Sequence, residues 1–257
     1  MTGYLPRIVM ITGATGGFGQ AFTRRFAAAG CSLVLTSRKP TELAALVREL
    51  QVPVHQVTVD VRDRAALEQM FSRLPPEFQA IDLLINNAGL ALGQEPAQDA
   101  DLDDWETMID ANNKGLVVCT RLALTGMVAR KRGHIINISS TASSYPYPGG
   151  HVYCASKAFV KQFSLSIRGD LSSANVRVTN IEPGMVETPF SLHRFKGDAA
   201  RAAAVYADAD PLTAEDVAES VFWAATMPAH VNINRIEMMS VSQAPGPLVV
   251  HRTPASA

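Results

Sequence analysis

The sequence predicts an α/β fold, a doubly wound parallel sheet of about seven strands with helices on both faces. Short apolar, β-branched runs alternate along the whole chain with longer amphipathic stretches. A strand, a helix and a second strand joined in this way form a right-handed crossover, which builds a parallel sheet. In addition, a glycine-rich turn directly follows the first apolar run, at residues 12–19.

The expected elements follow one another in order. Strands are expected at 8–12, 32–36, 54–59, 81–85, 135–138, 176–181 and 232–241. Helices are expected at 17–29, 41–50 and 64–74, over 102–130 with an interruption near 110–114, around Tyr153, and from Thr213, where Thr-Ala-Glu-Asp resembles a capping box. The first helix places Phe18, Phe22 and Phe26 one turn apart, so it presents an apolar face to the sheet.

We expect one domain, 1–257, because no repeat, linker or low-complexity segment divides the chain. After Pro183-Gly184 the alternation stops, and residues 185–211 contain no clear strand. We expect this segment to form a lid of loop and short helices over a pocket. The tail from Ala244, rich in proline and glycine, is expected to run over the surface or onto a neighbouring subunit.

Composition excludes several classes of function. The net charge of −1 gives no electrostatic reason to bind nucleic acid or an anionic membrane. No apolar run approaches the roughly 20 residues of a membrane span, and the start of the chain does not resemble a signal peptide. Cys31, Cys119 and Cys154 are odd in number and far apart, and the six histidines lack metal-ligand spacing. We therefore expect no disulfide and no metal, and a cytoplasmic location.

The glycine-rich turn predicts a nucleotide site. Glycines let the backbone approach a pyrophosphate, and the following helix supplies free N–H groups and the positive end of its dipole. The alternative is an ordinary tight turn between a strand and a helix. The residues expected at the cofactor are Gly13, Thr15, Gly16, Gly17, Phe18 and Gly19.

The end of the second strand favours NADP over NAD. A NAD site usually places an acid about 20 residues past the glycines, but here Thr36-Ser37-Arg38-Lys39 precedes the first acid, Glu42. Arg38 can bind a 2′-phosphate through its forked guanidinium, and Lys39 adds charge.

Two further strand ends complete the expected cofactor site. Asp60, followed by Val61, ends the third strand and is a candidate acceptor for the adenine amino group; alternatively it is a helix N-cap. The fourth strand ends in Asn86-Asn87-Ala88-Gly89, where amide side chains can brace strand ends and small residues leave room for a ribose.

Tyr153 and Lys157 are the candidate catalytic pair. Four residues apart on a helix, they share one face, and an ammonium beside a phenol favours the phenolate. We therefore predict that Lys157 lowers the pKa of Tyr153, so that Tyr153 can exchange a proton with an alcohol or carbonyl. Ser140, at the end of the fifth strand, is expected to face the same space, whereas Ser139 is expected to be structural. The alternative is an ordinary surface pair of tyrosine and lysine.

Together these pieces resemble the short-chain dehydrogenase/reductase family over nearly the whole chain. The likeness rests on Thr12-Gly-x-x-x-Gly17-x-Gly19, Asn86-Asn-Ala-Gly89, Asn112 in Asn-Asn-Lys-Gly115, Ser140, Tyr153-x-x-x-Lys157, and Pro183-Gly184 with Thr188. Residues 86–93, 105–110, 194–198 and 228–234 add a likeness to bacterial NADP-dependent 3-hydroxy acid dehydrogenases, also described as serine or L-allo-threonine dehydrogenases and malonic semialdehyde reductases.

The resemblance implies a Rossmann-type fold, NADP(H) as cofactor and a homotetramer. It implies that Tyr153 is the general acid/base, that Lys157 also holds the nicotinamide ribose, and that Ser140 binds the substrate oxygen. Asn112 would fix a water that links Lys157 to solvent. The nicotinamide would lie against Pro183, Gly184, Val186 and Thr188.

The substrate is expected to be a small 3-hydroxy acid, such as serine, allo-threonine or 3-hydroxypropionate. Arg194 is the candidate for binding its carboxylate, with a solvated basic loop as the alternative, and Tyr147 is expected to line the pocket. The sequence leaves open a reductase of other ketones or aldehydes. A non-catalytic NADPH-binding regulator is disfavoured, because Ser140, Tyr153 and Lys157 are all present. Glu182, directly before Pro183, has no assigned role.

Overall fold

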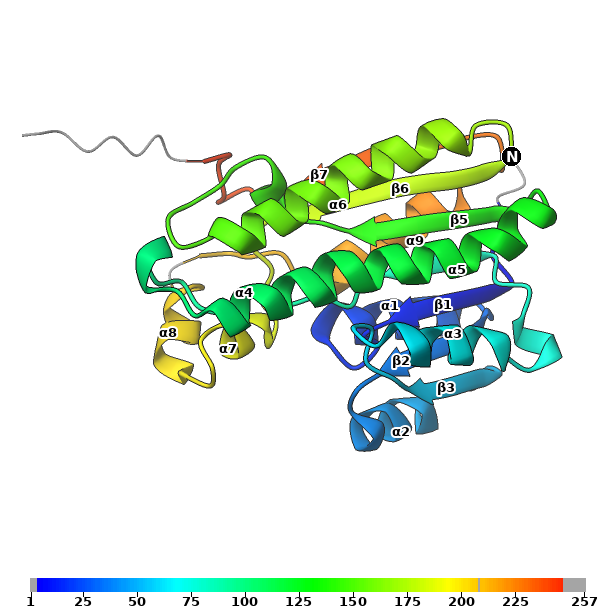
Figure 1. Cartoon of the computed structure of the whole chain (residues 1–257), viewed down its shortest axis with the longest axis horizontal. Coiled ribbons are helices and arrows are strands. Elements are labelled where there is room, and N and C mark those ends of the chain that lie inside the picture. Colours follow the sequence, from blue (N-terminus) through cyan, green and yellow to red (C-terminus); the bar gives the residue numbers. More distant parts are fainter. Residues whose placement is uncertain (1–3, 208, 247–257) are drawn as a thin grey trace, which may run out of the picture.

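A seven-stranded sheet forms the centre of the protein in this computed structural model, which describes residues 4–207 and 209–246. Every neighbouring pair is parallel, in the order β3-β2-β1-β4-β5-β6-β7 (Figure 1). The strands are β1 (Ile8–Thr12), β2 (Ser32–Ser37), β3 (Val54–Thr58), β4 (Leu83–Asn86), β5 (Gly133–Ile138), β6 (Val176–Pro183) and β7 (Arg235–Met238). The predicted fold class is confirmed.

The order of the strands places a crevice at one end of the sheet. The chain starts at β1 in the middle, winds outward to β3, returns to β4 beside β1, and winds outward again to β7. The loops after β1 and β4 therefore leave in opposite directions, and such a reversal is where ligands bind in open α/β sheets.

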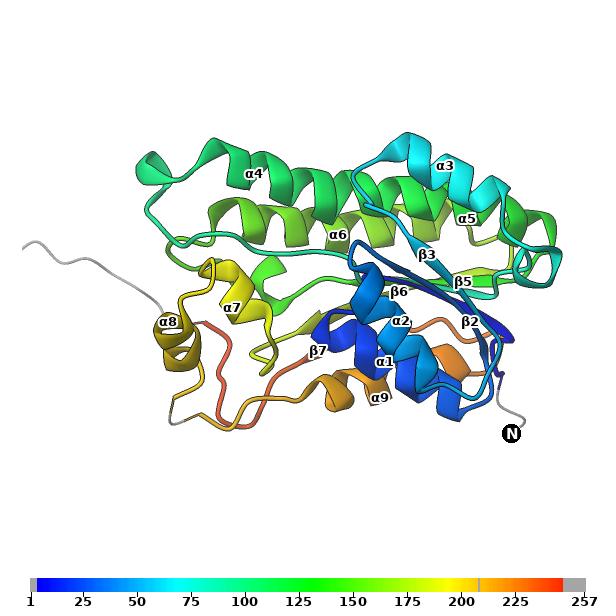
Figure 2. The same ribbon diagram turned by 90° about the horizontal axis from the view of Figure 1, so that it is seen from below.

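Helices cover both faces of the sheet, as Figure 2 shows. The helices α1 (Gly17–Ala28), α2 (Pro40–Arg48) and α9 (Ala214–Thr226) pack on one face. The other face carries α3 (Arg64–Ser72), α5 (Leu116–Ala129) and α6 (His151–Asp170), with α4 (Leu102–Ile109) extending the α5 layer.

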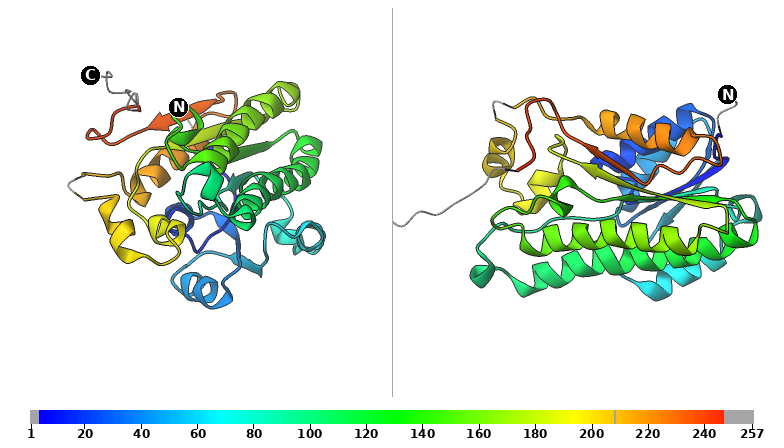
Figure 3. Two further views of the ribbon diagram at one scale, coloured as in Figure 1. Left: turned by 60° about the vertical axis from the view of Figure 1, so that its left-hand side comes forward. Right: turned by 90° about the horizontal axis from the view of Figure 1, so that it is seen from above.

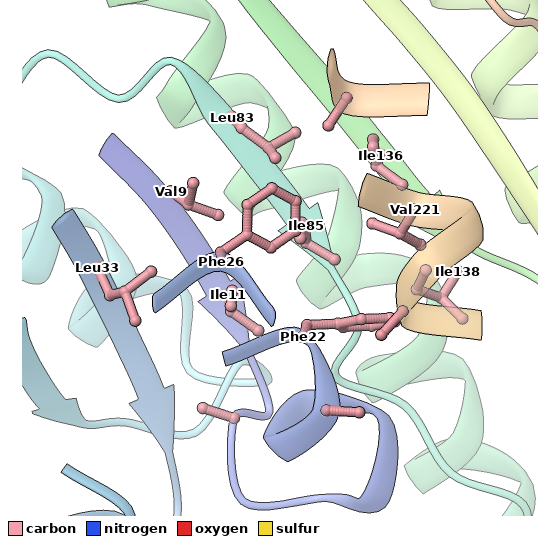
Figure 4. Packing of buried hydrophobic residues seen from close by; sticks show 14 of the residues in the cluster. Val9, Ile11, Phe22, Phe26, Leu33, Leu83, Ile85, Ile136, Ile138 and Val221 are labelled. Atoms are coloured by element: carbon pink, nitrogen blue, oxygen red, sulfur yellow. The ribbon is translucent and has the colours of Figure 1, made fainter. Parts of the chain in front are cut away.

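The core follows from the alternation of side chains along each strand. In β1, Val9 and Ile11 point to the α1 face, whereas Ile8 and Met10 point to the α5 face. Phe22 and Phe26 of α1 are fully buried against the first of these faces, as Figure 4 shows. Truncating a buried phenylalanine to alanine typically costs about 3–5 kcal/mol, so this packing fixes α1, and with it the glycine turn, on the sheet.

Three local features differ from the sequence-based expectation. The 102–130 segment is one continuous helical rod, because a π-helical turn at Asp110–Gly115 joins α4 to α5 instead of a break. The last strand is limited to Arg235–Met238, since the side chain of Asn232 binds both the N–H and the C=O of Val178 in place of backbone pairing. The cap of α3 is Asp63, so the alternative of Asp60 as an N-cap is wrong. The expected capping box of α9, Thr213 with Asp216, is confirmed.

Residues 185–207 and 209–211 follow β6 at the carboxyl end of the sheet and include α7 (Phe190–Arg194) and α8 (Ala199–Ala204), drawn in yellow in Figure 3. Of the tail, Ala244 and Gly246 line the crevice at this end, and Gly246 approaches Tyr145. The rest of the tail lies outside the described residues. Within the described ranges, no helix has the length and apolar character needed to cross a bilayer.

Candidate active site

A cavity of about 800 Å³ opens at the carboxyl ends of the strands. It is lined by most of the predicted site residues: Gly13, Thr15, Gly16, Gly17, Phe18, Arg38, Lys39, Asp60, Val61, Asn87, Gly89, Ser140, Tyr147, Tyr153, Lys157, Pro183, Gly184, Val186, Thr188 and Arg194. Gly19, Ala88 and Asn112 are not among the lining residues. The fold thus brings together segments that are far apart in sequence.

The glycine turn offers an open helix amino terminus. Gly13 has φ of +66°, a conformation that favours glycine, and any side chain at Gly19 would overlap the Gly13 carbonyl oxygen. Gly16 caps α1 without a side-chain hydrogen bond, and the first turn carries no acid. The first N–H groups of α1 are therefore free to bind an anionic phosphate, which fits a dinucleotide.

Asn86 and Asn87 brace the strand ends, as predicted. The Asn87 amide donates to the carbonyl oxygens of Thr12 (2.9 Å) and Gly13 (3.1 Å), while the Thr12 hydroxyl accepts from the Asn87 and Ala88 N–H groups. Asn86, buried, donates to Thr120 and to Asn137 of β5. These bonds hold the two sides of the crevice, β1 and β4, at a fixed separation.

Charge at the ends of β2 and β3 is arranged around Asp60. Arg62 forms a bidentate pair with this carboxylate, its Nη2 lying 2.7 Å from Asp60 Oδ2. The Nη1 of Arg38 is farther from the same oxygen, at 3.7 Å. Burial raises the pKa of Asp60, but the hydrogen bonds and charge of Arg62, with the charge of Arg38, outweigh burial and hold it below the ordinary value. Arg38 is half exposed and loosely held, so it can turn to a phosphate, whereas Lys39 pairs with Glu42 at 2.9 Å.

We predict that Arg38→Asp lowers the ratio of kcat/KM with NADP to kcat/KM with NAD by about tenfold or more, because a charge-assisted bond to the 2′-phosphate is lost and repulsion replaces it. Steady-state assays with both cofactors measure this ratio. Arg48→Asp, at the exposed far end of α2, is the matched charge control. An unchanged ratio in Arg38→Asp would rule out the assignment.

Tyr153 and Lys157 both face the cavity from α6, and the Lys157 ammonium lies 5.8 Å from the centre of the Tyr153 ring. The ammonium donates to the carbonyl oxygen of Ile138 at 3.0 Å. Burial lowers the pKa of Lys157 to about 8.

The expected effect of Lys157 on Tyr153 is not found in this structure. Burial raises the pKa of Tyr153 well above its ordinary value, and Tyr147 adds to the rise. Contact with Ser140 and the charge of Arg194 act in the opposite direction. Lys157 is not among these influences; its ammonium donates to the Ile138 carbonyl oxygen and lies 5.8 Å from the centre of the Tyr153 ring. Burial therefore dominates and favours the neutral phenol, the form that can donate a proton.

Ser140 begins the 3₁₀ turn Thr141–Ser143, its hydroxyl accepting from the Ala142 N–H at 3.1 Å and donating to the Pro183 carbonyl at 3.4 Å. It therefore lies between the ends of β5 and β6, facing Tyr153. Ser139, buried, donates to the Lys157 carbonyl at 2.8 Å. The structural role predicted for Ser139 is confirmed.

Asn112 lies in the π-helical turn, a feature often found at functional sites. Its side chain exchanges two hydrogen bonds with the backbone of Leu90 and donates to the Ser156 hydroxyl at 3.0 Å. These contacts tie the segment after Gly89 to helix α6. The water-mediated role of Asn112 stays a prediction.

Arg194 of α7 meets the two tyrosines at the outer end of the cavity. Its Nη1 donates to the Tyr147 hydroxyl at 2.7 Å and its Nε to the Gly93 carbonyl at 3.2 Å. The guanidinium carbon lies 5.1 Å from the Tyr147 ring centre and 5.8 Å from that of Tyr153. Its Nη2 is buried without a hydrogen-bond partner, and no carboxylate of the described residues pairs with this cation. Such a cation is suited to an anionic guest.

Two neighbouring lid residues, Lys196 and His193, differ in their surroundings. Lys196 pairs with Asp104 of α4 at 2.8 Å, and His193 lines the cavity rim. His151 packs against Trp105 and approaches the Glu95 carbonyl, consistent with a structural role.

Sequence reasoning missed Gln243 and gave no role to Glu182. The side-chain oxygen Oε1 of Gln243 accepts from the Met185 N–H at 2.7 Å and lies against Gly184, so the segment after β7 supports the backbone next to the expected nicotinamide. No sequence pattern marks this glutamine. Glu182 is fully buried and forms ion pairs with Arg235 and Lys161.

Comparison with known proteins shows to which family the chain belongs. A family model described as short chain dehydrogenase matches residues 7–198. The NADP-dependent 3-hydroxy acid dehydrogenase YdfG of Escherichia coli (strain K12) is 56% identical over 246 residues, covering 95% of this chain and 99% of the relative. Sulfoacetaldehyde reductase 2 of Chromohalobacter salexigens is 52% identical over 248 residues, covering 95% and 98%.

A solved structure described as "The Closed form of serine dehydrogenase complexed with NADP+" superposes with a TM-score of 0.94 at 56% identity, covering 96% of this chain and all of that one. The family predicted from the motifs is thereby confirmed, and the predicted cofactor agrees with these relatives. The chain, which carries the glycine turn, Ser140, Tyr153 and Lys157, therefore belongs to the short-chain dehydrogenase/reductase family.

Proposed function

We propose that this protein is an NADP-dependent oxidoreductase that transfers a hydride between the nicotinamide and C3 of small 3-hydroxy acids. Serine, L-allo-threonine and 3-hydroxypropionate, whose oxidation product is malonic semialdehyde, are the expected substrates. The observation that carries the proposal is the Arg194 guanidinium, which lacks an ion-pair partner among the described residues and lies 5.8 Å from the ring of Tyr153.

The cavity fits NADP(H) at three points. The free amino terminus of α1 suits the pyrophosphate, Arg38 suits the 2′-phosphate, and the Pro183–Thr188 segment leads from β6 to the nicotinamide end. A methyl group at Gly17 would come within 2.9 Å of Thr188, so the turn and this segment converge on one slot. When bound, the cofactor supplies the hydride.

The chain's own residues would handle the proton and the developing charge. Tyr153, whose raised pKa favours the protonated phenol, would donate its proton to the substrate oxygen during reduction. During oxidation its deprotonated form would accept the proton of the substrate hydroxyl. Ser140 would hydrogen-bond the same oxygen as charge develops on it. Lys157 would hold the nicotinamide ribose, and Asn112 would fix the water that passes protons to solvent.

Arg194 would hold the substrate carboxylate. Its fork can bind two carboxylate oxygens, while Tyr147 accepts a hydrogen bond from Nη1 and places its ring beside the guanidinium. The segment 185–211 would act as a lid, because Arg194 bonds to Gly93 through both its backbone and its side chain and so closes the cavity at that side. A homotetramer in the cytoplasm is part of the proposal, the location being supported by the three free cysteines.

A second candidate is the reduction of small aldehydes that carry a sulfonate. The relative from Chromohalobacter salexigens is named for sulfoacetaldehyde, and an arginine fork with a spare buried Nη2 can bind a sulfonate as it binds a carboxylate. Ketones without an acidic group are disfavoured, because they would leave the buried Nη2 of Arg194 without a partner. A cofactor-binding regulator is disfavoured by the complete set of Ser140, Tyr153 and Lys157.

A substrate panel tests the proposal. NADP reduction is measured with serine, L-allo-threonine, 3-hydroxypropionate and uncharged secondary alcohols of similar size, and NADPH oxidation with malonic semialdehyde and sulfoacetaldehyde. We expect kcat/KM for the acids to exceed that for the uncharged alcohols by about a hundredfold, the value of one strong charged bond. A clear preference for sulfoacetaldehyde would favour the second candidate. Equal rates with charged and uncharged substrates would contradict both.

A further inference from the structure

Glu182, the residue before Pro183 in β6, is a carboxylate with no exposed surface. Along β6, Ile181 packs in the α1 face of the sheet, so Glu182 points to the opposite face, beneath α6. A buried charge is costly unless it is paired and hydrogen-bonded, so its surroundings carry information about its role.

Both carboxylate oxygens of Glu182 have partners, which come from its own strand and from three other elements. One carboxylate oxygen forms an ion pair with Arg235 of β7, at 2.8 Å from Nε, and accepts a hydrogen bond from the Asn180 amide at 2.7 Å. The other accepts from the Ser143 hydroxyl at 3.2 Å and lies 3.7 Å from the Lys161 ammonium of α6. The carboxylate therefore bridges β6, β7, helix α6 and the turn after β5.

Two of these partners sit directly beside catalytic positions. Ser143 ends the 3₁₀ turn that Ser140 begins, and its N–H donates to the Ser140 carbonyl at 3.0 Å. Lys161 stands one helical turn beyond Lys157 and two beyond Tyr153, so all three lie along one face of α6. Lys161 also donates to the Ser144 hydroxyl at 2.6 Å.

We propose that Glu182 is a positioning residue: it fixes the Ser140 turn against helix α6, so that the Ser140 hydroxyl stays directed at the Tyr153 phenol. The Ser140 hydroxyl bonds to the carbonyl of Pro183, the residue that follows Glu182, so the same short segment of β6 holds both ends of the turn. Without the carboxylate, Ser143 and Lys161 lose their common partner, and the bond from Lys161 to the Ser144 hydroxyl is left to hold the turn against α6. This inference rests on the proposed role of Ser140.

The first test is Glu182→Gln, which keeps the shape of the side chain but offers one acceptor atom instead of two. We expect kcat for reduction to fall about tenfold, since a small displacement of a group that aligns the reaction lowers the rate in this way. KM for NADPH is expected to change by less than about twofold, because the cofactor's phosphates bind elsewhere. Glu237→Gln is the matched control: it removes the charge of a more exposed carboxylate that contacts the same Arg235.

The second test separates positioning from a general loss of structure. If Glu182 acts through Ser140, Glu182→Gln adds almost nothing to the loss of kcat in a Ser140→Ala background, whereas independent defects multiply. Wild-type kcat in Glu182→Gln, or full multiplication with Ser140→Ala, overturns the inference. If Ser140→Ala alone keeps full kcat, the proposed role of Ser140 is wrong, and the Glu182 inference fails with it. If Ser140→Ala lowers kcat but Glu182→Gln does not, only the Glu182 inference fails.

A milder variant decides the question if Glu182→Gln does not fold. Ser143→Ala removes one hydrogen bond from the same network at the side of the turn. We expect a several-fold lower kcat that also fails to multiply with Ser140→Ala. Unchanged kcat in Ser143→Ala would overturn the inference.

Discussion

Tyr153→Phe is expected to lower kcat by about a thousandfold while the affinity for NADPH changes little, because general acid–base catalysis typically contributes factors of this size. Phenylalanine keeps the ring that packs against Phe190, with centres 5.7 Å apart, and removes only the hydroxyl. The loss should appear equally in kcat and in kcat/KM, since the proton transfer occurs only in the transition state. Absorbance of NADPH gives turnover, and its fluorescence gives binding.

Tyr4→Phe is the matched control for this change. Tyr4 lies at the opposite end of the sheet, its ring 5.0 Å from the guanidinium carbons of both Arg132 and Arg177, and removing its hydroxyl should leave kcat unchanged. Turnover in Tyr153→Phe comparable to wild type would remove Tyr153 from the chemistry. A parallel loss of NADPH binding would instead indicate a structural defect.

The raised pKa of Tyr153 predicts how the wild-type rate depends on pH. Burial keeps the phenol protonated near neutral pH, so the reduction rate should stay flat between about pH 6 and 8. Oxidation needs the deprotonated phenol, whose fraction grows about tenfold per pH unit below the pKa, so the oxidation rate should rise with pH. An oxidation rate that falls from neutral to alkaline pH would contradict this assignment.

The sequence predicted most of the fold because its local signals agree with the sheet it builds. Val9 and Ile11 alternate with Ile8 and Met10, and the glycine turn requires a strand before it and a helix after it. The residue at which β7 begins was not predictable, since Asn232 replaces backbone pairing by a side-chain contact with Val178, 54 positions away. Such a contact leaves no periodic signal.

The same distinction separates the parts of the site. The motif residues were predictable, because Tyr153 and Lys157 are set by one helix and their spacing carries the chemistry. The direction in which the pKa of Tyr153 shifts was not predictable, because it depends on burial and on Tyr147, Ser140 and Arg194, which only the folded chain brings together. The partners of Glu182 come from β7, α6 and the turn after β5, so its role could not be predicted from the sequence either.

Arg194→Ala is expected to raise KM for serine and 3-hydroxypropionate by about a hundredfold, while KM for uncharged alcohols changes little, since only the acids lose a charge-assisted bond. Arg194 is the cation whose Nη2 is buried without a partner, so its truncation opens the site without orphaning a carboxylate among the described residues. Steady-state kinetics with matched acid and alcohol substrates measure the difference. Arg194→Lys should recover only part of the affinity, because an ammonium keeps the charge but cannot form the fork.

Lys196→Ala supplies the matched control from the same lid. Its ammonium pairs with Asp104 on α4 at 2.8 Å, so its loss can loosen the lid without removing a group from the cavity. Looser closure should affect acids and uncharged alcohols alike, whereas loss of the carboxylate site should affect only the acids. If Arg194→Ala raised KM for both kinds of substrate to the same degree, it would behave as Lys196→Ala does, and Arg194 would be a closing contact and not the group that selects 3-hydroxy acids.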